Sequence, residues 1–216
     1  MVTSPAADSA AVTIGVLALQ GDVREHIDAL AESGARTRTV RLAADLDGLD
    51  GLVIPGGEST TMSILAVRDR LLEPLRDFAG SGRPCFGSCA GLIFLADHVA
   101  DGRADQQTMG GLDVTALRNA FGRQVDSFET DLPVPVLGTE PFPAVFIRAP
   151  AITEVGPRVE VLASLEDRIV AVRQDNLLAT AFHPELTDDS RFHRYFVGMV
   201  AAHRGAGPES IVRERA

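Results

Sequence analysis

The chain has 216 residues, of which 45% are hydrophobic and 23% are charged, so it is long enough for one α/β domain with a full core. It has no apolar run of about 18 residues that would span a membrane, and its net charge of −10 disfavours nucleic acid and anionic lipid as partners. All 20 basic residues are arginine, so neither a lysine Schiff base nor a P-loop lysine is available.

Both ends of the chain are expected to lie outside its folded part. Residues 1–11 are small and polar and lack the basic and apolar segments of a signal peptide, so they are interpreted as a disordered extension. Residues 204–216 are expected to form a flexible tail. A single domain over residues 12–203 remains, and a cytoplasmic location is expected by default.

Strands and helices alternate through the first half of the chain. Short β-branched apolar runs predict buried strands, and the more polar segment 36–42 predicts a strand at an edge of the sheet. Ser59, Thr60 and Thr61 are expected to cap a helix. In chain order the pattern predicts strand 12–19, a helix from Val23, strands 36–42 and 49–54, a helix after Ser59, helix 71–78, strand 84–86 and helix 90–96.

The second half is richer in strand. It predicts strands 112–117, 124–130, 144–147, 159–164, 168–173 and 177–182, and a last helix over 189–203. Together the two halves predict an α/β three-layer sandwich with a mostly parallel central sheet covered on both faces.

The segment Gly87-Ser88-Cys89-Ala90-Gly91 has the form G-x-C-x-G between a strand and a helix. This is the pattern of a nucleophile elbow with sulfur in place of oxygen. The glycines permit a sharp turn, the start of the following helix favours a thiolate, and the Ala90 N–H faces the same space. A buried cysteine between two helix-stop glycines is the alternative interpretation.

Two further segments follow predicted strands. His183-Pro184-Glu185 places a histidine where it can exchange a proton with Cys89, and a glutamate where it can orient the imidazole. Pro55-Gly56-Gly57-Glu58-Ser59 brings backbone N–H groups to a strand end, which suits the second half of an oxyanion hole. A structural histidine and a plain strand-to-helix turn are the alternatives.

The other cysteine, Cys85, lies in the strand before the elbow and is expected to be a buried, non-catalytic side chain. Two cysteines four residues apart fit neither a disulfide framework nor a zinc site. No metal and no cofactor are expected.

These segments resemble the class I (triad) glutamine amidotransferases, and among them the family of glutaminase subunits of pyridoxal 5'-phosphate synthase, the PdxT or SNO family. The similarity extends over about residues 14–200, and the only departure noted near the elbow is Ser88, where threonine is expected. The matching stretches are IGVLALQG from Ile14, VREHIDAL from Val23, LVIPGGESTTM from Leu52, FGSCAGLIFLA from Phe86, RNAFGRQVDSFE from Arg118, VFIRAP from Val145 and FHPELT from Phe182.

The resemblance implies a flavodoxin-like fold and the hydrolysis of L-glutamine to glutamate and ammonia through a thioester. It implies a partner, the barrel-shaped synthase subunit, which builds pyridoxal 5'-phosphate with that ammonia. The implied catalytic residues are Cys89, His183 and Glu185, and the implied oxyanion donors are Gly57 and Ala90. The implied substrate-binding residues are Gly57, Glu58, Ser59, Arg118, Ile147 and Arg148, with Glu58 a candidate for the α-ammonium group and the two arginines candidates for the α-carboxylate.

Three other functions remain to be distinguished. A glutaminase for another acceptor, such as a histidine-pathway amidotransferase, is disfavoured by VREHIDAL and RNAFGRQVDSFE. A cysteine peptidase or thiol stress protein of similar fold would need neither H-P-E nor the Gly-Gly-Glu-Ser loop. A non-catalytic binding module would not need the complete triad. Ammonia release from glutamine, with and without the synthase, distinguishes these cases.

Overall fold

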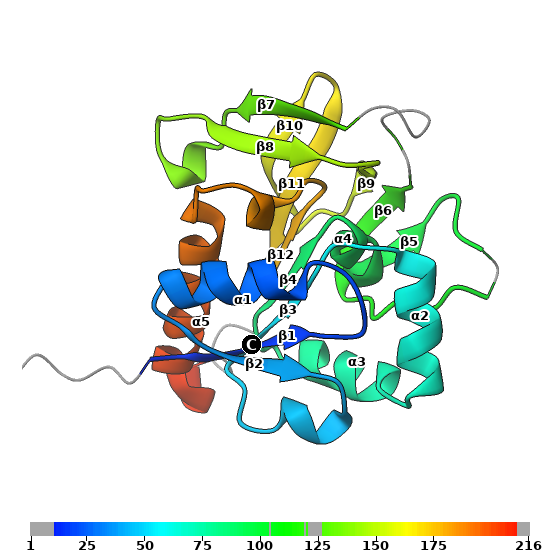
Figure 1. Ribbon diagram of the computed structural model, residues 1–216, viewed down its shortest axis with the longest axis vertical. Coiled ribbons are helices and arrows are strands. Elements are labelled where there is room, and N and C mark those ends of the chain that lie inside the picture. Colours follow the sequence, from blue (N-terminus) through cyan, green and yellow to red (C-terminus); the bar gives the residue numbers. More distant parts are fainter. Residues whose placement is uncertain (1–10, 104, 119, 121–126, 211–216) are drawn as a thin grey trace, which may run out of the picture.

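The centre of the molecule is a ten-stranded sheet. The computed structural model describes residues 11–103, 105–118, 120 and 127–210. The sheet order is β2-β1-β3-β4-β12-β11-β9-β6-β5, with β10 paired to β11 (Figure 1). Its strands are β1 (Thr13–Leu17), β2 (Arg36–Val40), β3 (Gly51–Ile54), β4 (Cys85–Ser88), β5 (Ala96–Val99), β6 (Leu112–Leu117), β9 (Ala151–Val155), β10 (Glu160–Leu165), β11 (Arg168–Gln174) and β12 (Leu177–Thr180).

The half of the sheet from β2 to β12 is parallel. Val53 of β3 pairs with Phe86 of β4, which in turn pairs with Leu178 of β12, and all three are fully buried. Such continuous apolar strands need helices on both faces of the sheet. The other half is mixed, because β11 runs antiparallel to β12 and β9, and β9 antiparallel to β6.

Helices cover the sheet on both faces. α1 packs beside α5, while α2 packs against α3 and α4; Figure 1 shows α5 to the left of the sheet and α2 to its right. The helices are α1 (Val23–Glu32), α2 (Ser59–Arg68), α3 (Leu72–Gly80), α4 (Ala90–Leu95) and α5 (Arg191–Ser210), with 3-10 turns η1 (Ala43–Leu46), η2 (Pro135–Leu137) and η3 (Pro184–Leu186). The predicted three-layer α/β sandwich is thereby confirmed.

A two-stranded antiparallel ribbon, β7 (Phe128–Leu132) with β8 (Phe142–Phe146), lies at the top of Figure 1, next to β10. It joins the core through aromatic contacts, since the Phe146 ring lies 5.4 Å from Phe182 and the Phe142 ring 4.9 Å from Phe192. No helix in the described part of the chain has both the length and the apolar character needed to cross a membrane.

Most predicted elements are present, with shifted ends. Segment 112–117 is β6 as predicted, and the polar segment 36–42 contains β2, which is an edge strand as expected. For the predicted strand 124–130, residues 124–126 lie outside the described residues, and β7 occupies 128–132. β5 and β9 were not predicted, because both are short and polar residues interrupt their apolar pattern.

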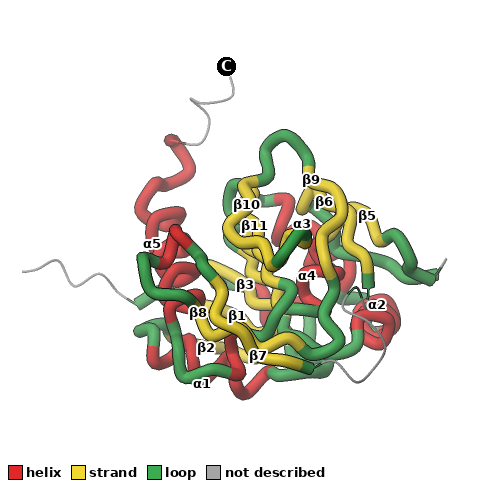
Figure 2. Tube along the Cα trace, turned by 90° about the horizontal axis from the view of Figure 1, so that it is seen from above, coloured by secondary structure: helices red, strands yellow, loops and turns green. Residues whose placement is uncertain are grey.

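Two predictions at helix ends are wrong. The last helix does not end at His203 but continues to Ser210, so the predicted tail 204–216 is helical in its first part, and Figure 2 shows this end of α5 projecting from the rest of the molecule. Glycine lowers helix propensity by about 1 kcal/mol without forbidding the helix, so Gly205 does not stop it. Of the predicted extension 1–11, all but Ala11 lies outside the described residues.

The second correction concerns α2. Its N-cap is Glu58, not the predicted Ser59, Thr60 or Thr61. The Glu58 carboxylate accepts hydrogen bonds from the backbone N–H groups of Thr60 and Thr61 at 3.0 and 2.6 Å. A carboxylate satisfies two of the orphan donors and complements the positive end of the helix dipole, which a hydroxyl does less well.

Candidate active site

Four neighbouring parallel strands, β1, β3, β4 and β12, send the loops that follow them to the same end of the sheet. Open α/β sheets bind their ligands at this end. A cleft of about 490 Å³ lies there. It is lined by Gln20, Asp22, Gly57, Glu58, Ser59, Ala90, Ile93, Arg118, Ile147, Arg148, His183 and Leu186. The six residues predicted to bind substrate and both predicted oxyanion donors are therefore brought together.

Cys89 occupies the sharp turn between β4 and α4. Its φ of 48° and ψ of −102° lie outside the regions that L-residues favour, a strain typical of functional sites. Two glycines make the turn possible. A Cβ on Gly87 would collide with the carbonyl of Gly91, and a Cβ on Gly91 would collide with the carbonyl of Ile54. The backbone angles of Cys89 and the close contacts of these two glycines give the turn the geometry expected of a nucleophile elbow.

His183 and Glu185 form a buried pair on the loop after β12. The Nδ1 atom of His183 lies 2.9 Å from Oε1 of Glu185, whose carboxyl group is fully buried and does not line the cleft. The His183 N–H donates to the carbonyl of Val145 at 2.9 Å, which ties the loop to β8. Since Nδ1 faces the carboxylate, Nε2 is the ring nitrogen left for proton exchange.

The charges of this pair depend on their contacts. Burial disfavours a charged imidazole, but hydrogen bonds with Asp22, Cys89 and Glu185 outweigh it and raise the pKa of His183. Burial also disfavours a charged carboxylate, yet His26 and His183 hold the pKa of Glu185 well below its ordinary value. Glu185 is therefore a carboxylate at neutral pH, as a residue that orients and stabilises an imidazolium must be.

Asp22 is a second carboxylate on the same imidazole, a contact that no pattern in the sequence predicted. Its Oδ2 lies 3.3 Å from Nδ1 of His183, and its side chain is 34% exposed at the edge of the cleft. Asp22 is the residue before α1, where an aspartate is ordinarily interpreted as a helix cap, but its side chain makes no capping hydrogen bond.

Replacing Asp22 by asparagine is expected to lower the pKa of His183, because one of the groups that favour the imidazolium is removed. His183 should then lose its proton at a lower pH than in the parent chain, as measured by nitrogen-15 NMR of the imidazole. The stabilisation from this contact is complete below the ordinary histidine pKa and declines as pH rises through the raised one. Asp28→Asn is a matched control, because Asp28 lies on α1 and pairs with Arg24. An unchanged His183 titration in Asp22→Asn would contradict this account.

The Gly56-Gly57 turn lies against both the imidazole and a glutamine side chain. A Cβ on Gly56 would lie 2.7 Å from His183 Nδ1, and one on Gly57 would lie 2.5 Å from the Gln20 amide. Gly57 also has a φ of 140°, which L side chains rarely adopt. Gln20 accepts a hydrogen bond from the Glu58 N–H at 3.0 Å, so its side chain braces this loop.

Opposite charges face each other at the cleft wall. Nη2 of Arg118 lies 3.6 Å from Oε1 of Glu58. Partial burial opposes ionisation of Glu58, but hydrogen bonds from Thr61 and Thr60 lower the pKa of its carboxyl group. Arg118 and Ser59 are bridged by Gln106, at 3.2 and 3.3 Å. The cleft thus presents a carboxylate and guanidinium groups, the complements of an amino acid's ammonium and carboxylate.

The other cysteine, Cys85, is buried in β4. Burial raises the pKa of the Cys85 thiol to about 12, against a smaller effect of Arg83, so Cys85 stays protonated.

Among the described residues, one group of three has potential metal-ligand atoms within 4.8 Å of one another: Asp22, His183 and Glu185. Both carboxylates face Nδ1 of the imidazole, so hydrogen bonding accounts for the cluster.

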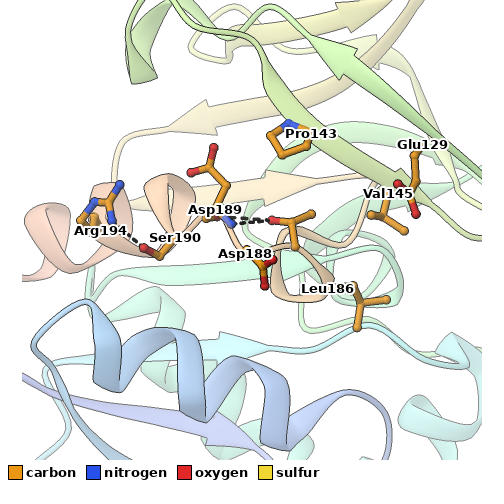
Figure 3. Close-up of a pocket in the computed structure, with 9 residues that line it drawn as sticks. Glu129, Pro143, Val145, Leu186, Asp188, Asp189, Ser190 and Arg194 are labelled. Atoms are coloured by element: carbon orange, nitrogen blue, oxygen red, sulfur yellow. Dashed lines mark hydrogen bonds between the residues drawn. The ribbon is translucent and has the colours of Figure 1, made fainter.

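A second cleft, of about 620 Å³, lies between the β7–β8 ribbon and the start of α5 (Figure 3). Its nine lining residues include neither cysteine nor histidine, and Arg194 donates to Ser190 within it at 2.5 Å. Leu186 lines both clefts, so the two adjoin. The His183 imidazole and the charged wall belong to the first cleft, which is also lined by Ala90, the residue after Cys89.

Comparison with known proteins agrees with this arrangement. The model of the SNO glutamine amidotransferase family matches residues 16–202. A pyridoxal 5'-phosphate synthase subunit PdxT of Kineococcus radiotolerans is 60% identical over 199 residues, which cover 89% of this chain and 96% of that protein. A PdxT subunit of Clavibacter sepedonicus is 57% identical over 92% of this chain and 95% of its own length.

A solved structure described as a glutamine amidotransferase superposes with a TM-score of 0.81 at 49% identity, covering 87% of this chain and 98% of its own. The family match spans most of the chain and includes every segment that forms the cleft. The chain therefore belongs to the SNO glutamine amidotransferase family.

Proposed function

We propose that the chain hydrolyses the side-chain amide of L-glutamine and delivers the ammonia to the synthase subunit that builds pyridoxal 5'-phosphate. The observation that carries this proposal is the position of His183. Its imidazole lies between the cysteine turn and the buried Glu185 carboxylate, at the wall of a cleft that presents both charges needed to bind an amino acid. The names of the PdxT relatives support the choice of acceptor pathway.

The proposed reaction begins with attack of the Cys89 thiolate on the amide carbon of glutamine. A carbon–sulfur bond forms, and the carbon–nitrogen bond breaks as His183 donates a proton to the departing ammonia. A γ-glutamyl thioester remains on Cys89. His183 then takes a proton from water, and the resulting hydroxide attacks the thioester carbon. The carbon–sulfur bond breaks, the Cys89 thiolate is restored, and glutamate leaves. Glu185 orients His183 and stabilises its positive charge throughout.

We assign the oxyanion hole to the backbone N–H groups of Gly57 and Ala90. Both residues line the cleft, one after β3 and one at the start of α4. For the substrate's polar end, Glu58 would take the ammonium group and Arg118 or Arg148 the carboxylate. Glu58 and Arg118 lie 3.6 Å apart and form an ion pair. A bound amino acid can replace this ion pair with two others, one between its ammonium group and Glu58 and one between its carboxylate and Arg118. Ser59 and Ile147 complete the wall.

The partner in this proposal is the barrel-shaped synthase subunit. The chain has no lysine, so the Schiff-base chemistry of pyridoxal phosphate assembly would belong to that partner. The loop Gln20-Gly21-Asp22 and the start of α1 border the cleft and are the proposed part of the docking surface. We propose that residues 12–203 act as one glutaminase domain in the cytoplasm, without metal or cofactor.

The experiment that tests the proposal is a measurement of glutamate and ammonia from L-glutamine, by the chain mixed with a synthase subunit of a PdxT-containing pair. Stoichiometric release of both products, and incorporation of the amide nitrogen into pyridoxal 5'-phosphate, are expected. Glutamate formed without nitrogen transfer would point to a different acceptor. If L-glutamine is hydrolysed in none of the mixtures, the glutaminase assignment is contradicted.

The two residues paired on the loop after β12 are expected to contribute unequally. His183→Asn should be nearly as damaging as loss of the nucleophile, because it removes both proton transfers. Glu185→Gln should be milder, because an imidazole held less well still exchanges protons; the loss is expected at or below about 10⁴-fold in kcat. Steady-state kinetics of both variants with the synthase tests this order. A greater loss in Glu185→Gln than in His183→Asn would mean that the two roles are wrongly assigned.

A further inference from the structure

A buried polar chain continues beyond Glu185. Nε2 of His26 lies 3.3 Å from Oε2 of Glu185 and 2.9 Å from Oγ of Ser88, while Ser88 donates to Oε1 of Glu185 at 3.3 Å. On the other side of the ring, Nδ1 of His26 lies 3.0 Å from Nε2 of His193. His26, Ser88 and His193 are all fully buried, and they come from α1, β4 and α5. The mechanism above uses none of these three side chains.

The surroundings of His26 decide which of its nitrogens carries the proton. A bare Nε2 would point its lone pair at the Glu185 carboxylate 3.3 Å away, and the two would repel. Nε2 therefore carries a hydrogen, which it donates to Oγ of Ser88. Ser88 then accepts from His26 and is free to donate its own hydrogen to Glu185.

His193 completes the assignment. Burial, followed by the proximity of His26, lowers the pKa of His193 to about 3, so this ring carries one hydrogen. Its Nδ1 has no hydrogen-bond partner within the described part of the chain. An unpartnered N–H in the core costs more than an unpartnered lone pair, so the hydrogen belongs on Nε2 and is donated to Nδ1 of His26. This leaves Nε2–H as the stable tautomer of His26.

We propose that His26 is a positioning residue for the glutaminase reaction: its Nε2–H binds Ser88, whose hydroxyl holds the Glu185 carboxylate toward His183, and His193 fixes the tautomer that makes this possible. This inference rests on the proposed function. The hydrogen bonds run from His193 to His26, from His26 to Ser88 and from Ser88 to Glu185, and His183 donates to Glu185 from the other side. Oε1 of Glu185 thus accepts from both His183 and Ser88, while Oε2 has no hydrogen-bond partner in the described part of the chain, so the orientation of the carboxylate does not depend on His183 alone.

His26 and His183 both hold the pKa of Glu185 low against the effect of burial. An orienting carboxylate must stay charged and must not rotate. Removing a group that orients a functional side chain typically lowers activity roughly 10- to 100-fold.

The kinetic test uses two conservative substitutions that separate the nitrogens. The amide of glutamine reaches the position of Nε2, whereas the shorter amide of asparagine reaches only that of Nδ1. With the synthase present, His26→Asn is expected to lower kcat roughly 10- to 100-fold with KM for glutamine unchanged. His26→Gln should keep most of the parent kcat. His98→Asn is the matched control, because His98 is exposed on β5. Equal kcat in the parent chain and His26→Asn would overturn the proposal, and so would equal losses in His26→Asn and His26→Gln.

A second measurement does not depend on activity or on the stability of any variant. Nitrogen-15 NMR of the parent chain distinguishes protonated from bare ring nitrogens. We expect Nε2 of His26 and Nε2 of His193 to be protonated, and a partial loss of the His26 tautomer in His193→Leu. A bare Nε2 on His26 would overturn the proposal even in a fully active enzyme. Absence of glutaminase activity in the parent chain, with this NMR pattern present, would instead remove the proposed function.

Discussion

Cys89→Ala is expected to abolish glutamine hydrolysis while the fold and thermal unfolding temperature stay close to those of the parent chain. Without the sulfur no thioester forms, and the remaining groups have no nucleophile to activate. For catalytic units of this kind, loss of the nucleophile costs on the order of 10⁶-fold in kcat. The measurement is steady-state glutamate production with the synthase present. Cys89→Ser is expected to be similarly inactive, because the hydroxyl is a far weaker nucleophile here.

The chain offers its own control for this experiment. Cys85→Ala removes the other thiol, which is fully buried with a pKa of about 12 and packs as a small hydrophobic side chain in β4. This variant should keep most of the activity, with some loss of stability from the lost packing. Normal hydrolysis by Cys89→Ala, or complete inactivity of a folded Cys85→Ala, would mean that the wrong cysteine has been assigned.

The second large effect is expected from the partner. The isolated chain should hydrolyse glutamine slowly, and saturating synthase should raise kcat about 10²- to 10³-fold. The physical reason is the Gly56-Gly57 peptide, which can rotate at little steric cost because neither residue has a Cβ. If its N–H points away in the free chain, the oxyanion loses one donor, worth roughly 3–4 kcal/mol of transition-state stabilisation.

The residues next to the Gly56-Gly57 peptide explain how docking of the synthase would change the position of its N–H group. The Gln20 side chain lies against Gly57 and accepts from the Glu58 N–H, and Asp22 contacts His183 from the same loop. A partner that contacts this loop would therefore act on the oxyanion donor and the imidazole together. Steady-state glutamate production by the chain alone, compared with the same chain in saturating synthase, tests the idea. Equal kcat values would contradict the gating, though not the glutaminase assignment.

The sequence was a good guide to the site where local backbone chemistry decides the structure. G-x-C-x-G predicts a tight turn because only glycine fits at Gly87 and Gly91, and both glycines are in contact with backbone carbonyls as the pattern requires. The apolar runs before Gly56, Cys89 and His183 predict parallel strands, whose carboxyl ends meet at one end of the sheet. The fold class and the meeting of these three segments follow from such features, whereas Arg118, Ile147 and Arg148 were expected in the cleft only because of the family resemblance.

The sequence was a poor guide where contacts join distant segments. His26 and Glu185 are far apart in the chain and meet only because α1 packs beside α5 and the loop after β12. On a helix of this length a histidine at a core position is ordinarily interpreted as a packed side chain. Likewise, Glu58 caps α2 ahead of three hydroxyl residues because a carboxylate accepts two N–H bonds at once. Capping propensities rank residue types one at a time and do not predict which of several neighbouring candidates becomes the N-cap.

The most direct test of the central claim is to trap the thioester. The chain, its synthase and L-glutamine are mixed, quenched in acid during turnover, digested and analysed by mass spectrometry. The account predicts one γ-glutamyl group on the peptide that contains Cys89, and none in the Cys89→Ala variant. Glutamate that accumulates while the glutamyl group is found on another residue would contradict it.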